Sequence, residues 1–597
     1  MKLTDKQYQA ALHKDGPCLV LAVPGAGKTT MILERIKILS ENIDPKHILS
    51  LTFSKTQAQD MRKRYKGDES NFMTIHAFCY LIIRNYYNKT HRTLRILESD
   101  DTYNKYNLIR KIYLDINGKT ISNEDLNDFF TQIGYMRNAM LDISYLKDSN
   151  VRNIEKIYTE YENFKKENNY IDFDDMQTIA YDLICKDERL LKSIKNKYKY
   201  IQLDEGQDTS LLQFRILEKI IYPDNNIIIV ADDDQSIYSF RAADPSYLLN
   251  FKNIFKDGKI ITMDENHRSQ ENIVDLSAKF IEKNTTRYKK NLYTNIPAQS
   301  KVIFKTLKDA KASYKYLMDN MEVNKTNAIL YRNNISSLNL ISFLMKDGID
   351  FTINAETLDL FESKIVVDIF NVIRFSEDFN NSEIFSEIYY KIKTYLKKSD
   401  IDQLEFKPVN MNIFDYLYEI IDDDLAYNLE RKEKELKHIR TLSLNRKISY
   451  IYSYMGYSDY INMYSNKYYE EVMNKDLYIE SMVNFTQGLG CIEEFDEKVS
   501  ELEKIIKKKS NSNLILSTIH KSKGLEYDNV FVIDLVKNEF PIISDYRNNM
   551  LEMEEERRIM YVAMTRAKEK LHLISLKTRN GRKIKPSIFY DDLKKLV

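Results

Sequence analysis

Short apolar runs bounded by polar or glycine-rich residues predict buried strands. Residues 18–23 (CLVLAV) have the length and branching typical of a strand buried on both faces of a parallel sheet. Residues 198–209 (YKYIQLDEGQDT) and 227–243 (IIIVADDDQSIYSFRAA) each begin with another short strand that ends at acidic residues. The pattern therefore predicts three strands, each followed at once by a polar loop.

Longer segments follow the spacing of a helix. Residues 429–440 (LERKEKELKHIR) and 493–509 (EEFDEKVSELEKIIKKK) carry apolar residues at helical intervals. The segment 85–196 is charged, is rich in Tyr and Lys, and lacks strand signals, so we expect it to be helical. No run of 18 or more apolar residues is present and the N-terminus lacks the apolar core of a signal peptide, which predicts no membrane span and no secretion.

Composition narrows the class of protein. A chain of 597 residues far exceeds the roughly 250–300 residues at which single cores stop growing, so several domains are expected. The 89 basic and 89 acidic residues cancel, but a local basic groove could still hold nucleic acid. The four cysteines form no CxxC pair, which argues against a zinc or iron–sulfur site and favours a reducing, cytoplasmic setting.

The first predicted strand leads into a phosphate-binding sequence. Pro24, Gly25, Ala26 and Gly27 interrupt regular structure, and residues 28–33 (KTTMIL) resemble the start of a helix. This is a Walker A loop in its [AG]xxxxGK[ST] form, in which backbone N–H groups close around phosphates at the positive end of a helix. In such a loop, Lys28 would hold the β- and γ-phosphates, and the hydroxyl of Thr29 would bind Mg²⁺. The alternative is a glycine-rich turn without a ligand.

The second strand ends in two adjacent carboxylates, Asp204 and Glu205. Adjacent carboxylates repel each other unless a cation or a reaction uses them. We expect Asp204 to hold Mg²⁺ through water and Glu205 to orient or deprotonate an attacking water. The alternative is a solvated helix start.

The third strand is followed by an acidic turn and an aromatic segment. Gln235 is placed to sense a γ-phosphate, and Tyr238, Phe240 and Arg241 would form a stacking surface with a cation beside it. Bases stack on aromatic faces for about 1–3 kcal/mol each, whatever the sequence. The alternative is that the rings occupy core positions.

With these motifs, the chain resembles the UvrD/Rep/PcrA-type superfamily 1A DNA helicases, in order and over nearly its whole length. The segments that carry the resemblance, besides the three above, are LTDKQ at 3–7, LTFS at 51–54, TIHAF at 74–78, DFDD at 172–175, ENHRS at 265–269, LYRN at 330–333, LFESK at 360–364, TIHKSKGLE at 518–526, EERR at 555–558 and YVAMTRA at 561–567. The resemblance implies two RecA-like P-loop motor domains, with parallel sheets flanked by helices and a helical insertion in each.

The resemblance also assigns roles by position. For ATP, it implies that Gln7 reads adenine, Arg35 and His267 stack on it, Glu526 contacts the ribose, Arg268 and Arg566 reach the γ-phosphate, and Pro24 to Thr30 form the phosphate loop. For DNA, it implies contacts from Phe53, Thr74, His76, Tyr238, Phe240, Arg241, Thr518 and His520. ATP and Mg²⁺ are the expected cofactors. Two positions depart from the family: His267 replaces a Tyr and Phe240 replaces a Trp.

The motifs also divide the chain. We expect a first motor domain from 1–84 and 197–270 with a helical insertion at 85–196. A second motor domain from 271–376 and 511–597 would carry an insertion at 377–510, shorter than in well-known relatives. The chain ends soon after residues 586–589 (PSIF), so the C-terminal tail that many relatives use for partners is expected to be absent.

The resemblance implies an ATP-dependent helicase or translocase that moves 3′ to 5′ on single-stranded DNA and acts at single-strand/duplex junctions in DNA repair, replication or recombination. Two alternatives stay open: a translocase that does not unwind, and a regulatory ATP-binding subunit of a larger repair or phage-defence complex with a nuclease or repair factor as partner. The hydrolytic positions, including Lys28, Glu205 and Gln235, are intact, which favours a working ATPase. A cytoplasmic protein of a bacterium, or of a phage or plasmid within one, is expected.

Overall fold

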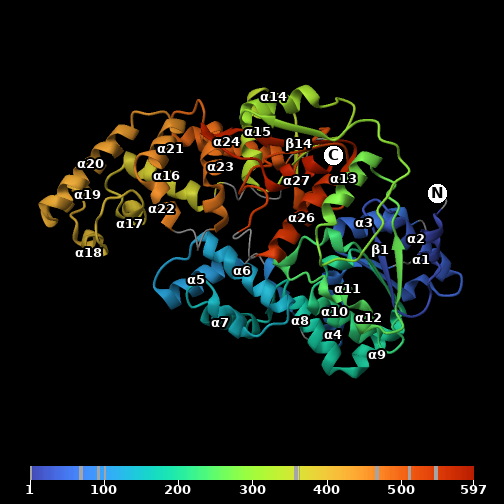
Figure 1. The fold of residues 1–597 in the computed structure, drawn as a ribbon. Coiled ribbons are helices and arrows are strands. Elements are labelled where there is room, and N and C mark those ends of the chain that lie inside the picture. The colour runs from blue at the N-terminus through green and yellow to red at the C-terminus, as the bar shows by residue number, and fades with distance from the viewer. Residues whose placement is uncertain are drawn as a thin grey trace. The chain divides into compact units, whose positions relative to one another are not determined.

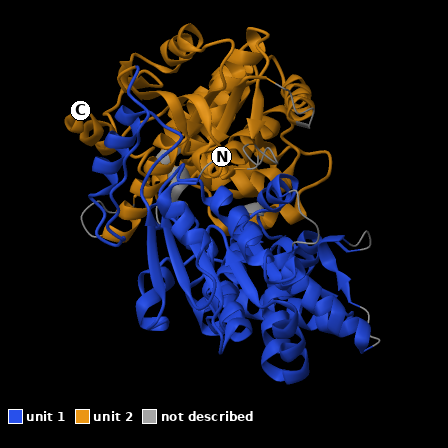
Figure 2. Cartoon of the chain, turned by 90° about the vertical axis from the view of Figure 1, so that its right-hand side faces the viewer, with its two compact units in different colours: residues 1–299 blue, residues 300–597 orange. Residues whose placement is uncertain are grey.

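The computed structural model describes residues 3–65, 71–90, 94–99, 103–354, 361, 363–463, 469–507, 512–543 and 549–597 (Figure 1). The chain divides into two compact units, Met1–Gln299 (unit 1) and Ser300–Val597 (unit 2), coloured separately in Figure 2. Each unit is built on its own six-stranded sheet.

The sheet of unit 1 is entirely parallel. Its order is β3-β2-β6-β7-β1-β8, with strands β1 (Cys18–Ala22), β2 (Ile48–Thr52), β3 (Asn71–Thr74), β6 (Tyr200–Leu203), β7 (Ile227–Ala231) and β8 (Lys259–Met263). Every residue of β1, β2 and β7 is buried, which explains their continuous apolar sequences. Helices α1 (Asp5–Ala11), α2 (Lys28–Ser40), α3 (Lys55–Arg64), α4 (Ile75–Lys89), α10 (Leu211–Ile221) and α13 (Glu271–Ile281) accompany the sheet.

A helical segment interrupts this sheet between β3 and β6. It contains α5 (Lys105–Asn117), α6 (Asn123–Asn138), α7 (Ile154–Glu167), α8 (Asp175–Lys186) and α9 (Glu188–Lys197). The expectation that it lacks strands was wrong in one detail, because β4 (Arg95–Ile96) pairs in parallel with β5 (Tyr170–Ile171). Two-residue strands are too short to leave an alternating pattern in the sequence.

Buried ion pairs tie three of these helices together. Arg137 on α6 lies 3.1 Å from Asp172 and from Asp175, and Lys165 on α7 lies 2.7 Å from the same two carboxylates. Breaking such a pair by removing one partner costs about 3–5 kcal/mol because it leaves a buried charge. The DFDD segment at 172–175 is therefore a structural junction that joins α8 to α6 and α7.

The sheet of unit 2 is also entirely parallel. Its order is β11-β12-β10-β13-β14-β9, with strands β9 (Ile303–Leu307), β10 (Asn327–Tyr331), β11 (Thr352–Asn354), β12 (Leu514–Thr518), β13 (Tyr527–Val532) and β14 (Ala567–Leu576). It is accompanied by α14 (Ala310–Asn320), α15 (Ile335–Lys346), α16 (Lys364–Glu377), α25 (Ile519–Ser522), α26 (Met550–Met564) and α27 (Ile588–Leu596).

Between α16 and β12 lies a second helical segment, which Figure 1 shows in yellow to orange. It contains α17 (Ser382–Ile388), α18 (Lys398–Asp402), α19 (Ile413–Ile420), α20 (Asp423–Ile439), α21 (Leu444–Ser453), α22 (Tyr457–Met463), α23 (Tyr469–Phe485) and α24 (Ile492–Lys507). The helices predicted at 429–440 and 493–509 correspond to α20 and α24, although Lys508 and Lys509 lie outside the described residues.

One buried arginine joins this helical segment to the sheet of unit 2. The guanidinium of Arg579 bonds to Glu480 on α23, and it lies 2.9 Å from Asp534 and 2.5 Å from Glu539 in the loop after β13. Burial raises the pKa of Glu539 to about 7, although Arg579 opposes the shift.

The α/β fold with two parallel sheets flanked by helices is confirmed. Across the described residues, no helix combines the length and the apolar character needed to cross a membrane.

Candidate nucleotide and DNA site

The phosphate loop connects β1 to α2, and its backbone requires glycine. Gly25 and Gly27 have φ of +71° and +75°, in the left-handed region that favours glycine. A Cβ at Gly25 would lie 2.8 Å from the Cβ of Arg268, and one at Gly27 would lie 2.6 Å from Nε2 of Gln7. This packed loop at the start of a 13-residue helix has the form of an anion-binding cradle.

Lys28 and Glu205 form an ion pair beside this cradle. Nζ of Lys28 lies 2.8 Å from each carboxylate oxygen of Glu205. Burial lowers the pKa of Lys28, but the negative charges of Glu205 and Asp204 raise it by more, so the pKa of Lys28 lies above its ordinary value. The structure thus brings the predicted phosphate-binding lysine and the predicted base into direct contact.

Asp204 lies next to this pair and has the chemistry of a cation ligand. Burial and the neighbouring Glu205 carboxylate raise the pKa of Asp204 to about 7. Thr29 is the second residue of α2 and is partly exposed. A buried carboxylate destabilised by a like charge, with a hydroxyl oxygen on the phosphate loop, fits the hard oxygen ligands that Mg²⁺ prefers.

Gln7 is held against the phosphate loop. Its side chain accepts a hydrogen bond from the Thr4 backbone in a capping box at the start of α1, and its Nε2 donates to the carbonyl of Ala26 at 2.9 Å. Thr30, also in the loop sequence, accepts a hydrogen bond from Arg64 at 3.3 Å. Pro24 and Ala26 are buried.

The turn at 265–269 packs on the same loop. Oδ1 of Asn266 accepts from the backbone of Arg268 and Ser269, and the backbone N–H of His267 donates to the carbonyl of Gly25 at 3.1 Å. His267 itself is exposed, with Nδ1 3.5 Å from Glu265. Arg268 is therefore fixed by its backbone beside Gly25.

The structure contradicts the expected role of Arg35. Its side chain is fully buried, and it donates to the carbonyls of His13 and Lys14 and to the side chain of Gln202. Burial lowers the pKa of Arg35 to about 10. A guanidinium enclosed in this way offers no exposed face on which an adenine ring could stack. Its hydrogen bonds instead join α2 to residues 13–14 and to β6.

The predicted stacking surface is exposed rather than part of the core. The rings of Phe53 and Tyr238 are stacked with centroids 4.9 Å apart, and Phe240 lies 5.9 Å from Tyr238. The guanidinium of Arg241 lies 5.7 Å and 5.6 Å from the centroids of Tyr238 and Phe240. Phe53 is 36% exposed and Phe240 is 48% exposed, so these rings offer an aromatic surface with a cation beside it.

Two further predicted DNA contacts lie at the start of α4. Thr74 caps this helix by accepting from the N–H of Ala77, and His76 is exposed with Nε2 2.7 Å from Nε2 of Gln177. Phe53 and Thr74 both follow the carboxyl ends of parallel strands, β2 and β3.

Unit 2 holds the remaining predicted residues at two edges of its sheet. Thr518 ends β12 and caps α25, which contains His520. Glu526 and Arg566 directly precede β13 and β14, where Glu526 pairs with Lys568 at 2.9 Å. Arg566 is buried and donates to the carbonyls of Val562 and Leu525 and to the hydroxyl of Thr565.

Sequence reasoning missed three residues that contact the site in unit 1. Gln207 is fully buried, donates to Glu205 at 2.5 Å, and accepts from the backbone of Asp232 at 2.9 Å. Arg287 and Lys290 pair with the three consecutive aspartates 232–234. The run of three aspartates was the available signal, because buried carboxylates require cations.

Among the residues that the structure describes, two clusters of three carboxylates have the spacing of metal ligands, namely Glu162 with Asp172 and Asp175, and Asp232 with Asp233 and Asp234. Each group lies within ion-pair distance of lysine and arginine side chains. Protein cations therefore already balance their charge.

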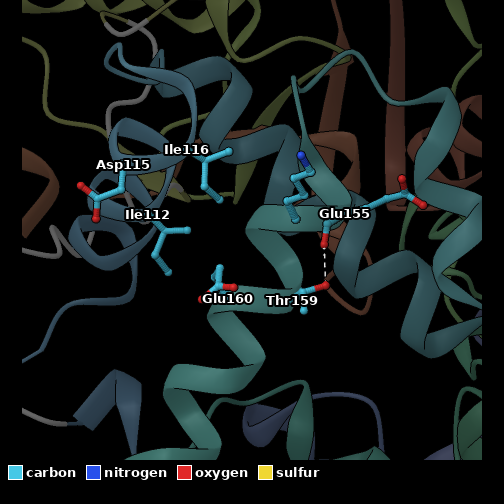
Figure 3. A pocket seen from close by; sticks show the side chains of 7 residues that line it. Ile112, Asp115, Ile116, Glu155, Thr159 and Glu160 are labelled. Carbon is cyan, nitrogen blue, oxygen red and sulfur yellow. Dashed lines mark hydrogen bonds between the residues drawn. The ribbon is translucent and has the colours of Figure 1, made fainter.

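A groove lies away from these residues, between α5 and α7. Its volume is about 580 Å³, and Figure 3 shows Ile112 and Ile116 of α5 facing Thr159 and Glu160 of α7. The carboxylates of Asp115, Glu155 and Glu160 outnumber the single Lys156 in its lining, so the groove would repel phosphate groups.

Proteins that combine such a glycine loop with paired carboxylates at the end of another strand of the same parallel sheet are P-loop NTPases, and unit 1 has that construction. Comparison with protein families specifies the group. The UvrD/REP helicase N-terminal domain matches residues 3–256, and the UvrD-like helicase C-terminal domain matches residues 261–578. The chain belongs to the UvrD/Rep helicase family, and its enzyme class is ATP-dependent DNA helicase.

Individual relatives agree with this family. The chain is 30% identical to a Mycoplasma capricolum protein described as "Probable DNA helicase II homolog", over 99% of this chain and 87% of that protein. It is 25% identical to the ATP-dependent DNA helicase PcrA of Staphylococcus epidermidis (97% of this chain, 84% of that protein). It is 24% identical to PcrA of Staphylococcus aureus (97% and 83%).

Proposed function

We propose that this helicase moves 3′ to 5′ along single-stranded DNA and separates strands at single-strand/duplex junctions, in DNA repair, replication or recombination. One observation supports the coupling of ATP hydrolysis to DNA binding in this proposal. The ten residues 232–241 contain Gln235, the candidate γ-phosphate sensor, together with the half-buried ring of Tyr238 and the exposed ring of Phe240. A change at the phosphate therefore reaches the DNA-facing surface within three residues.

Hydrolysis follows from the residues around the phosphate loop. Lys28 pairs with Glu205, so the phosphates of ATP would compete with Glu205 for the lysine. Once Lys28 turns to the phosphates, the Glu205 carboxylate can accept the proton of an attacking water, and Gln207 keeps it oriented. Thr29 and Asp204 would hold Mg²⁺, which supplies charge stabilisation for phosphoryl transfer.

Two arginines complete the proposed site. Arg268 belongs to unit 1, where its backbone is fixed beside Gly25. Arg566 belongs to unit 2, where it is buried directly before β14, and it would stabilise the charge that develops on the γ-phosphate.

Strand displacement tests this proposal. The purified protein is given duplexes with a 3′ tail, a 5′ tail or no tail, ATPase activity is followed in the same samples, and Lys28→Ala is the blank. We expect displacement of the 3′-tailed duplex alone. Displacement of only the 5′-tailed duplex would reverse the polarity, DNA-stimulated ATPase without displacement would indicate a translocase, and ATP binding without stimulated hydrolysis would indicate a regulatory subunit.

A further inference from the structure

Three consecutive aspartates lie at the carboxyl end of β7, and the protein buries all of them. Asp232, Asp233 and Asp234 are at most 1% exposed. Three like charges in such a place would be strongly destabilising without cations. The cations come from residues 285–294, which we call the strap.

The strap provides two cations to these aspartates. Nζ of Lys290 lies 2.6 Å from Asp232, 2.6 Å from Asp233 and 2.8 Å from Asp234. Arg287 makes a two-pronged contact with Asp234 at 2.7 and 2.6 Å. The backbone N–H of Tyr288 adds a hydrogen bond to Asp233 at 2.7 Å.

The other end of the strap holds the turn that carries Arg268. The backbone N–H of Asn266 donates to the carbonyl of Tyr293 at 2.7 Å, and the hydroxyl of Thr294 donates to the carbonyl of Asn266 at 2.6 Å. One short segment thus contacts the 232–241 loop through its cations and the 265–269 turn through the Tyr293 carbonyl and the Thr294 hydroxyl.

Asp232 is the point where the strap meets residues proposed for hydrolysis. One carboxylate oxygen accepts from Lys290, and the other accepts from Nε2 of Gln235 at 2.7 Å. Its backbone N–H donates to Gln207, which donates to Glu205. A continuous buried relay therefore runs from Lys28 through Glu205, Gln207 and Asp232 to Gln235 and Lys290.

We propose that Lys290, assisted by Arg287, is a positioning residue that fixes Gln235 and the DNA-facing loop against Glu205, and so couples DNA binding to ATP hydrolysis. This inference rests on the proposed function. Simple neutralisation of charge would require only that cations lie near the aspartates. In the relay, however, Lys290 and the candidate γ-phosphate sensor bind the same carboxylate. Loss of Lys290 should therefore change the turnover of ATP rather than its binding.

The test keeps the local charge constant. The double variant Lys290→Met/Asp233→Asn removes one cation and one anion together, and Lys289→Met, an exposed neighbour, is the matched control. Melting temperature, KM for ATP, basal kcat and DNA-stimulated kcat are measured for each protein. We expect the double variant to retain its melting temperature and its KM, while the stimulation by single-stranded DNA falls about 2- to 30-fold. Lys289→Met should match the wild type.

Retention of wild-type stimulation by the double variant would overturn the inference and leave Lys290 as a charge-balancing residue. If the melting temperature of the double variant falls, the variant Arg287→Lys provides the test instead, because it keeps the charge but loses the two-pronged contact. This variant too should lose stimulation by single-stranded DNA while its KM for ATP stays unchanged. Stimulation of the wild type is measured first. Its absence would reject the proposed function itself, which is a different outcome from equal stimulation in wild type and variant.

Discussion

In unit 1, apart from Gln7 on α1, the residues assigned to ATP and those assigned to DNA lie at or after the carboxyl ends of parallel strands β1, β2, β3, β6, β7 and β8. In unit 2, Thr518 and His520 follow the carboxyl end of β12, whereas Glu526 and Arg566 lie at the opposite edge, just before β13 and β14. The two sheets share a parallel six-stranded construction, yet only one places both sets at the same edge.

The difference teaches how each unit can link its two ligands. In unit 1 the link is one loop, residues 232–241, held by buried ion pairs. In unit 2 the link is the segment 519–526, which runs from the carboxyl end of β12 to the amino end of β13 and includes the short helix α25. The loops after the inner strands also differ: β1 leads to Gly25 and Gly27, whereas β10 leads to Arg332, which pairs with Glu556 at 2.8 Å.

The largest effect is expected on kcat, from a variant that tests whether the amino edge of the unit 2 sheet takes part in ATP hydrolysis. Arg566→Ala should lower kcat by about 10³–10⁵, because an arginine at the γ-phosphate supplies that much in phosphoryl transfer. ATP binding, measured with a fluorescent analogue, should change little. Near-normal turnover would mean that Arg566 has only a structural role, through its hydrogen bonds to Val562 and Leu525. The amino edge of the unit 2 sheet would then have no role in ATP hydrolysis through this residue.

Glu205→Gln tests the carboxyl edge of unit 1. The amide cannot accept the proton of the attacking water, so kcat should fall by roughly 10²–10⁴. Because the ion pair to Lys28 is also lost, affinity for ATP should be equal or higher. Single-turnover hydrolysis and nucleotide binding separate the two effects, and unchanged turnover would remove Glu205 from the mechanism.

The next largest effect is expected when the aromatic surface is removed. Tyr238→Ala with Phe240→Ala should raise the DNA concentration for half-maximal stimulation about 5- to 150-fold, as expected for about 1–3 kcal/mol of lost stacking. Basal ATPase should stay close to wild type, because the rings are partly exposed. Loss of basal activity together with a lower melting temperature would show that the rings support the fold instead.

The smallest effect concerns the glycine loop that distinguishes β1 from β10. Gly25→Ala should raise the KM for ATP roughly 5- to 30-fold, because a left-handed residue costs about 1–2 kcal/mol once it carries a Cβ. Gly16→Ala is the matched control, with φ of +81° and no atom within 4 Å of the added Cβ. Equal KM values for the two variants would mean that contact with Arg268 does not shape the loop.

Local patterns were sufficient to predict the phosphate loop, the strand ends and the exposed rings. These features lie within a few residues of one another, so their chemistry is visible in the sequence. Arg35 was assigned wrongly because position in a motif does not reveal burial. Gln207, Arg287 and Lys290 were missed because the partners in these three contacts lie 25 or more residues away in the sequence, and only the fold brings them together.

The exposed position of Phe240 offers an optical use. The chain has 43 tyrosines and no tryptophan, so Phe240→Trp would install a single indole fluorophore on a surface that already tolerates a ring. Indole emission depends on solvent access and on stacking partners, and the neighbours here are Tyr238 and Arg241. The variant would report the passage of bases through its own emission, without a dye on either the protein or the DNA.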